Sequence, residues 1–240
     1  MSAPLALVYR GKAAKPSACS DAVAGLLASS AHGFDVRFVG PKERLGITSD
    51  VLAGAALYAQ PGGGELGPAY RRMRRYRDTI RDYVAAGGRY LGFCLGGYLA
   101  GQTPGFGLLP GDTDQYVRTK RATVRTTDDT VVELRWRGSQ RYLFFQDGPV
   151  FQLDPDATGV DVLARYPNGE LAALVAPFGA GRVGVVGPHP EATPDWYGDL
   201  GLPDPDPEHA ELGHDLIDAL MGGPAANAAR PARAGWRRIW

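Results

Sequence analysis

The chain holds one cysteine whose surroundings favour nucleophilic chemistry. Cys94 lies in a Gly-Phe-Cys-Leu-Gly run, between an apolar strand expected over residues 89–93 and a small-residue helix expected over 95–101. This pattern is the cysteine form of the nucleophile elbow, in which a sharp turn directs the side chain outward and Gly92 and Gly96 let neighbouring backbone pass. At the start of a helix, free N–H groups and the dipole also favour the thiolate. The alternative is a structural cysteine buried at the end of a core strand.

A histidine and a glutamate follow another expected strand. The run Val-Val-Gly-Pro-His-Pro-Glu places His189 at the strand end and Glu191 two residues later. An imidazole can take the thiol proton, and a carboxylate on its other nitrogen fixes its tautomer and orientation. The alternative is a strand-end histidine beside a solvent-facing glutamate. The other histidines, His32, His209 and His214, have no such partners and are expected at the surface.

A glycine-rich loop follows a third expected strand, in the run Gln-Pro-Gly-Gly-Gly at residues 60–64. Glycines there allow backbone N–H groups to turn toward a developing oxyanion, and Gly63 with Leu95 could form an oxyanion hole. A plain glycine-rich loop is the alternative. The cysteine, histidine and glycine features all fall at carboxyl ends of expected parallel strands, where open α/β sheets place their ligands. Taken together they predict a Cys94–His189–Glu191 catalytic triad.

The order of elements predicts an α/β fold with a parallel sheet covered on both faces. Short strands with hairpin-like turns then predict an antiparallel extension. We expect one domain over residues 1–222, followed by an Ala/Pro/Arg-rich tail over 223–240. Strands are expected at 5–9, 34–39, 55–60, 89–93, 122–125, 131–136, 142–145, 160–166, 171–177 and 182–186, and helices at 21–29, 66–86, 95–101 and 208–221.

Composition narrows the class of protein. Lysine plus arginine and aspartate plus glutamate both number 26, so the formal net charge is zero and gives no case for nucleic acid or an anionic membrane as partner. The two cysteines make neither a disulfide framework nor a zinc site. No signal peptide or long apolar run is visible, which predicts a cytoplasmic protein. We expect a small-molecule substrate and no cofactor or metal, with a homodimer as one possible assembly.

With these motifs the chain resembles the class I glutamine amidotransferase-like superfamily. It resembles most the stand-alone relatives of the N-terminal domain of eukaryotic-type biotin–protein ligases. The matching segments span about residues 5 to 192. They are Val8-Tyr9-Arg10-Gly11, the glycine loop at 60–64, the run from Tyr83 to Cys94, Gln146-Asp147-Gly148-Pro149-Val150-Phe151 and Gly187-Pro188-His189-Pro190-Glu191.

The resemblance implies a flavodoxin-like three-layer sandwich in which Cys94 is the nucleophile, His189 the base and Glu191 the orienting acid. Gly63 and Leu95 match the family's oxyanion donors. Apart from the resemblance, the expected pocket includes Gly62, Gly64, Tyr98 and Asp147, the last because its loop can reach the crevice. One departure stands out, because true glutamine amidotransferases usually carry a glutamine where this chain has Tyr98. A phenol is bulkier and cannot both donate to and accept from an amide as a carboxamide does.

We therefore expect a cysteine hydrolase acting on a small amide other than free glutamine, with acyl transfer through the triad. Neither a synthetase domain nor a biotin ligase catalytic domain is present in the 240 residues. The alternative is a non-catalytic binding or regulatory module of the same fold. A third reading, the parkinsonism-associated deglycase-like branch, shares the elbow but typically lacks such a His-Pro-Glu strand end.

Arginines recur at helical spacing between Arg71 and Arg81. One interpretation is a solvated helix face that pairs with Asp78 and Asp82, and the other is a site for an anion or a partner. Cys19, beside two serines, is expected to be a small residue at a helix start.

Overall fold

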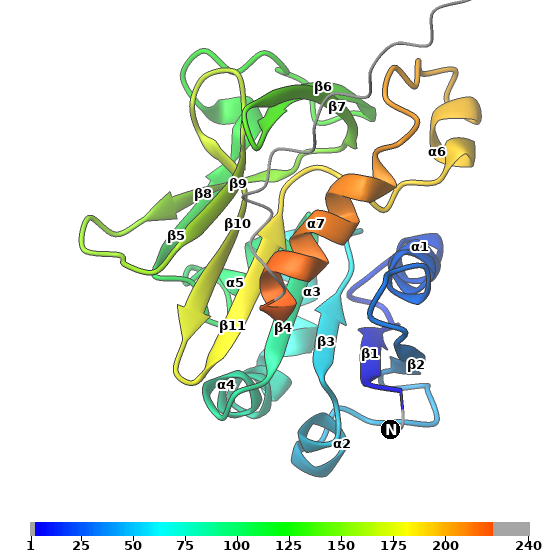
Figure 1. The fold of residues 1–240 in the computed structure, drawn as a ribbon, viewed down its shortest axis with the longest axis vertical. Helices are drawn as coiled ribbons and strands as arrows, with labels where there is room; N and C mark the ends of the chain where they lie inside the picture. The colour runs from blue at the N-terminus through cyan, green and yellow to red at the C-terminus, as the bar shows by residue number, and fades with distance from the viewer. Residues whose placement is uncertain (1–2, 223–240) are drawn as a thin grey trace, which may run out of the picture.

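The computed structural model describes residues 3–222, so the expected tail over 223–240 lies outside the described residues. Five parallel strands form the core of the sheet, in the order β2-β1-β3-β4-β11 (Figure 1). This is the flavodoxin-like strand order, and the expected parallel sheet is confirmed. The strands are β1 (Leu5–Tyr9), β2 (Asp35–Val39), β3 (Leu57–Gln60), β4 (Arg89–Phe93) and β11 (Gly181–Val186).

Helices cover both faces of this sheet and make three layers. Side chains alternate along β1, so that Ala6 and Val8 enter one core while Leu7 and Tyr9 enter the other. Helices α1 and α7 pack over the first core, and α3, α4 and α5 pack over the second (Figure 1). The helices are α1 (Ala18–Ala28), α2 (Ser49–Ala53), α3 (Leu66–Met73), α4 (Arg77–Ala85), α5 (Leu95–Ala100), α6 (Pro194–Gly198) and α7 (Ala210–Met221).

The sheet continues beyond β11 as the expected antiparallel extension. Strands β10, β9, β6 and β7 follow in that order, and β8 joins β10 to β5. The extension rises beside the parallel sheet, near its carboxyl ends (Figure 1). Its strands are β5 (Gly111–Gln115), β6 (Thr130–Trp136), β7 (Ser139–Phe145), β8 (Pro149–Leu153), β9 (Asp161–Arg165) and β10 (Leu171–Phe178).

Several expected elements were wrong. No strand forms at residues 122–125, because the Tyr116 hydroxyl accepts the amide hydrogen of Thr123 at 3.0 Å, where the chain bends. Strands β5 and β8 were missed, and the polar composition of β5 has little strand propensity. The long helix expected over 66–86 is interrupted by a 3₁₀ turn at Arg74–Tyr76 (η1), where arginines three and four residues apart repel one another.

Within residues 3–222, none of the helices is both long and apolar enough to cross a lipid bilayer.

Candidate active site

Cys94 occupies a strained turn between β4 and α5. Its backbone has φ 46° and ψ −105°, a conformation that residues other than glycine rarely adopt. The flanking glycines permit the turn: a Cβ on Gly96 would lie 1.9 Å from the carbonyl oxygen of Gln60, and one on Gly92 would lie 2.5 Å from the Gly96 carbonyl oxygen. The amide of Cys94 donates to the carbonyl of Val186 at 2.8 Å, which fixes the turn to the neighbouring strand β11. The elbow geometry predicted for Cys94 is thus present.

His189 and Glu191 lie on the loop that follows β11. Nδ1 of the imidazole is 2.9 Å from Oε1 of Glu191, and each residue is only 3% exposed. The amide of His189 donates to the carbonyl of Phe144 at 2.9 Å, so strand β7 of the antiparallel extension holds the loop in place. The alternative of a solvent-facing glutamate is excluded by this burial.

Cys94 and His189 meet across Gly62. A Cβ built on Gly62 would lie 2.8 Å from Cε1 of His189 and 3.3 Å from Cβ of Cys94, so both side chains border the same small space. Burial lowers the pKa of His189, but its interactions with the carboxylate of Glu191 and with the side chain of Cys94 outweigh burial and raise that pKa to about 10. The arrangement therefore favours the protonated form of the His189 imidazole. The Cys94 thiol lies 3.5 Å from the carbonyl oxygen of Gln146, to which it donates a hydrogen bond.

The glycine loop passes close to the cysteine turn. Gly63 has φ +96°, and a Cβ there would lie 2.3 Å from the carbonyl oxygen of Lys15, so the position excludes side chains. Across residues 3–222, neither the amide of Gly63 nor that of Leu95 donates to another protein group outside the regular helix and strand bonds. Both residues line one pocket with Cys94. The two amides are therefore available to an oxyanion in that pocket.

The pocket over Cys94 encloses about 440 Å³ and carries negative charge. Glu65, Asp114 and Asp147 line it, and no lysine, arginine or histidine of the described chain does. Asp147 accepts a hydrogen bond from Gln115 through Oδ2 at 2.7 Å, while its buried Oδ1 has no partner among the described residues. Burial raises the pKa of Asp147, which the hydrogen bond from Gln115 partly offsets.

Three of the four expected pocket residues line this cavity, namely Gly64, Tyr98 and Asp147, whereas Gly62 lies between Cys94 and His189. The Tyr98 hydroxyl donates to the carbonyl of Asp147 at 3.0 Å. Burial is the main cause that raises the pKa of this phenol, so it stays protonated and keeps that bond. The hydroxyl proton of Tyr98 is thus already committed to the protein.

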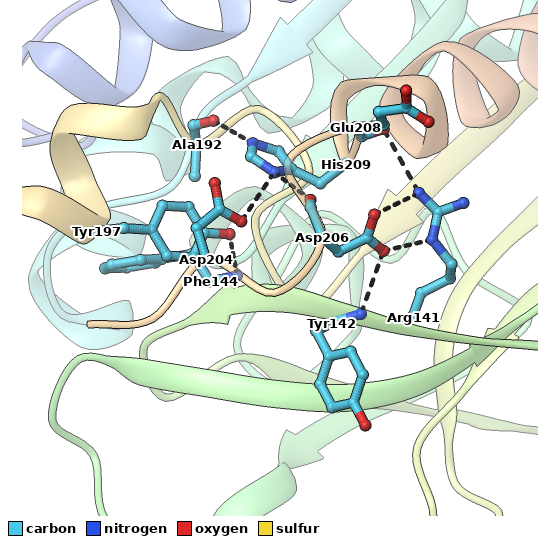
Figure 2. A network of polar contacts seen from close by, with 9 residues as sticks. All are labelled: Arg141, Tyr142, Phe144, Ala192, Tyr197, Asp204, Asp206, Glu208 and His209. Carbon is cyan, nitrogen blue, oxygen red and sulfur yellow. Dashed lines mark hydrogen bonds and ion pairs between the residues drawn. The ribbon is translucent and has the colours of Figure 1, made fainter. Parts of the chain in front are cut away.

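A polar network that sequence reasoning missed supports the loop of His189 and Glu191 (Figure 2). His209 was expected at the surface, but it is 3% exposed and both ring nitrogens face carbonyl oxygens, those of Ala192 at 2.7 Å and Asp206 at 2.9 Å. Ala192 directly follows Glu191, so His209 holds the end of that loop. The expectation failed because both partner carbonyls, those of Ala192 and Asp206, lie in irregular segments, where no hydrophobic periodicity reports which residues are buried.

The same network reaches strand β7 at two points. The side chain of Asp206 binds the guanidinium of Arg141, and the Tyr197 hydroxyl accepts the amide hydrogen of Phe144 at 2.8 Å (Figure 2). Phe144 in turn accepts the amide hydrogen of His189 through its carbonyl. The position of the imidazole therefore depends on the antiparallel extension and on the segment between α6 and α7.

Comparison with solved structures identifies the fold. A crystal structure of a glutamine amidotransferase matches 90% of this chain and 98% of its own, with a TM-score of 0.59 and 19% identity. A candidate GMP synthase component from Thermoplasma acidophilum matches 92% of this chain and 94% of its own, with a TM-score of 0.59 and 11% identity. The chain thus has the class I glutamine amidotransferase-like fold, as the resemblance implied.

Within that class, sequence similarity points to one family. Residues 5–123 match the family described as biotin-protein ligase, N terminal. A biotin–protein ligase from Schizosaccharomyces pombe is 26% identical over 165 residues, which cover 58% of this chain and 26% of that protein. The chain is therefore similar to the N-terminal domain of biotin–protein ligases, and it spans about a quarter of the length of this relative.

Proposed function

We propose that the protein is a cysteine hydrolase that cleaves a small amide through Cys94, His189 and Glu191. The observation that carries the proposal is the buried His189–Glu191 pair, 2.9 Å between Nδ1 and Oε1, placed beside a cysteine in a strained elbow. Neither strain nor a buried ion pair is favourable for stability by itself. Their coincidence at one place, beside the pocket over Cys94, is typical of a catalytic site.

The proposed reaction is acyl transfer in two steps. The Cys94 thiolate attacks the amide carbonyl, the C–N bond breaks, and His189 gives its proton to the leaving amine. Water then attacks the thioester carbonyl, with His189 taking a proton from it, and the acid leaves as the C–S bond breaks. The oxyanion of each tetrahedral intermediate would accept hydrogen bonds from the amides of Gly63 and Leu95. Glu191 holds the imidazole tautomer throughout.

The pocket favours a substrate that carries a positive or hydrogen-bond-donating group near the amide. Its charged side chains are all carboxylates, and an ionised carboxylate attracts such a group and accepts its hydrogen bonds. Free glutamine is disfavoured, because Tyr98 fills the position of the usual glutamine and its hydroxyl is bound to a carbonyl of the protein.

A non-catalytic binding module is the second candidate function. The buried Tyr98 favours it, since this side chain occupies space that a glutamine-hydrolysing site leaves to the substrate. The two candidates differ in the state of Cys94. A working site needs a reactive thiolate, whereas a binding module needs only the shape of the pocket.

Alkylation of Cys94 by iodoacetamide between pH 5 and 9 separates these functions. An enzyme should show a reaction that persists below pH ~7 and is slowed in a His189→Ala variant, because a thiol without a cationic partner reacts mainly near pH ~8.5 and above. A Cys94→Ala variant identifies any labelling of Cys19. Reactivity that rises only above pH ~8 and ignores His189 would refute the enzyme.

The charge of the pocket can be tested with two thiol reagents of opposite charge. Cys94 should react faster with aminoethyl methanethiosulfonate than with sulfonatoethyl methanethiosulfonate. The ratio of the two rates should fall in Asp147→Asn, while the rate with neutral iodoacetamide stays unchanged. Equal rates with both reagents in the parent protein would refute a preference for cationic substrates.

A further inference from the structure

A second cleft, larger than the pocket over Cys94, opens at the carboxyl ends of β1 and β2. It encloses about 960 Å³ and is formed by the loop after β1 at residues 11–17, the loop after β2 at 41–43, and helix α3 with the turn η1. Helix α1, which follows β1, covers one face of the sheet, and α3, which follows β3, covers the other. The boundary between the neighbouring strands β1 and β3 is therefore the switch point at which open α/β sheets bind ligands, and the cleft adjoins it. A volume in this range suits a small molecule.

Cationic side chains dominate the lining of this cleft. Six of them are exposed and come from all three segments, namely Lys12, Lys15, Lys42, Arg71, Arg72 and Arg75. Within residues 3–222, none of the six forms an ion pair with a carboxylate. The chain as a whole has a formal net charge of zero, so this concentration of charge is local.

The nearest carboxylates do not neutralise these six cations. Glu43 lines the cleft, but its carboxylate pairs with Arg10 at 2.9 Å. Asp21 lies 3.6 Å from the same guanidinium. Arg10, which also lies over the ring of Phe38, thus holds both acids in a separate cluster. The remaining cations repel one another, and an anion that bridges the three segments would relieve that repulsion.

The start of helix α1 adds further positive potential. Ser17 lines the cleft at the N-terminus of this eleven-residue helix, and its hydroxyl makes no capping hydrogen bond. The dipole and free N–H groups of a helix start favour phosphate.

The arginines of α3 and η1 do not form the face paired with Asp78 and Asp82 that was one interpretation of the sequence. Among the described residues, the expected pairing with Asp78 forms only for Arg77, at 3.7 Å.

We propose that this cleft binds a small oligophosphate anion. Several phosphate groups along one molecule match cations that come from three separate segments, and arginine binds phosphate in a bidentate manner. The cleft shares no lining residue with the pocket over Cys94. The loop of Lys15 lies between them, since the Lys15 carbonyl contacts Gly63 while the same residue lines the cleft. The site is thus additional to the proposed hydrolase and does not depend on it.

Titration calorimetry of the full chain with sodium tripolyphosphate and with ATP tests the proposal. We expect saturable binding of one molecule of each to one protein. Tighter binding of ATP would assign a role to the nucleoside, whereas equal affinities would assign the site to the phosphate chain alone. Citrate, an anion of similar size without phosphate, should bind more weakly than tripolyphosphate.

Two double variants separate the cleft from general charge. Lys42→Ala with Arg71→Ala removes two lining cations and should weaken tripolyphosphate binding at least about tenfold, because each charged hydrogen bond is worth roughly 1.5–3 kcal/mol. Arg44→Ala with Arg74→Ala removes the same charge from neighbouring exposed positions that do not line the cleft, and should bind as the parent does. Equal weakening by both variants, absence of binding to both phosphates, or tighter binding of citrate would overturn the proposal. Thermal unfolding confirms that each variant is folded.

Discussion

The small space beside Gly62, which the side chains of Cys94 and His189 both border, gives a direct test of the Cys94–His189 pairing. An alanine Cβ at this position would lie 2.8 Å from Cε1 of His189 and 3.3 Å from Cβ of Cys94. Carbon atoms pack at about 3.5–4.0 Å, so the ring has to withdraw by roughly 1 Å. The backbone of Gly62 does not have a positive φ, so alanine fits the main chain without strain. Gly62→Ala therefore separates the two side chains while leaving the turn intact.

A displacement of about 1 Å in a catalytic pair can cost about 10²-fold. A thiol with the reference pKa of ~8.5 and no cationic partner is only about 0.3% thiolate at pH 6. We therefore expect iodoacetamide alkylation of Gly62→Ala at pH 6 to be slower than in the parent by roughly 100-fold. The difference should shrink at pH 9, where most ordinary thiols are ionised.

The pH dependence distinguishes lost pairing from simple obstruction. A methyl group that only blocks the reagent would slow alkylation by the same factor at every pH, whereas broken pairing would give the profile of a His189→Ala variant. Gly25→Ala, on α1 with open space around its Cβ position, is the matched control and should leave the rate unchanged. If Gly62→Ala reacts at pH 6 as fast as the parent protein, the inferred pairing is refuted.

Three further predictions concern stability and are checked by thermal unfolding. Tyr197→Phe leaves the buried amide of Phe144 without its acceptor and should lower the free energy of unfolding by about 1–3 kcal/mol. The control Tyr142→Phe loses only an exposed hydrogen bond to Gln140 and should lower it far less. Equal effects of the two variants would contradict the role of the network. Gly96→Ala places a Cβ 1.9 Å from a backbone oxygen. It should lower the free energy of unfolding by about 3 kcal/mol and Tm by about 6–12 °C. An unchanged Tm would show that the turn tolerates side chains. Because the pKa of His189 is raised from 6.5 to about 10, the stability that its protonation contributes should be complete below pH 6.5 and lost as pH rises toward about 10. The difference in Tm between the parent and His189→Gln should therefore shrink over that interval. A difference that grows with pH would contradict the inferred direction of the pKa shift.

The local signals in the sequence were sufficient for the parallel sheet and for the turn that holds Cys94. The strands β1, β3 and β4 are short apolar runs, a pattern set by burial on both faces, and β3 and β4 end in glycine-rich turns that need backbone freedom. The glycines around Cys94 have a purely local reason, since the strained turn and its close backbone contacts leave no room for a Cβ. The antiparallel extension was harder to predict from the sequence, because the polar strand β5 forms only through its pairing with β8.

Tertiary structure decided which residues meet. Strand β11 lies beside β4, and this pairing of segments far apart in the chain brings His189 to Cys94. The burial of His209, the negative pocket over Cys94 and the cationic cleft also arise where loops from different strands converge. Sequence periodicity reports only the face that one element buries, so it cannot give the distance between two loops. The sequence by itself therefore determined the turn at Cys94 and the succession of the parallel strands along the chain, while packing of the whole chain determined the charge and the partners around the site.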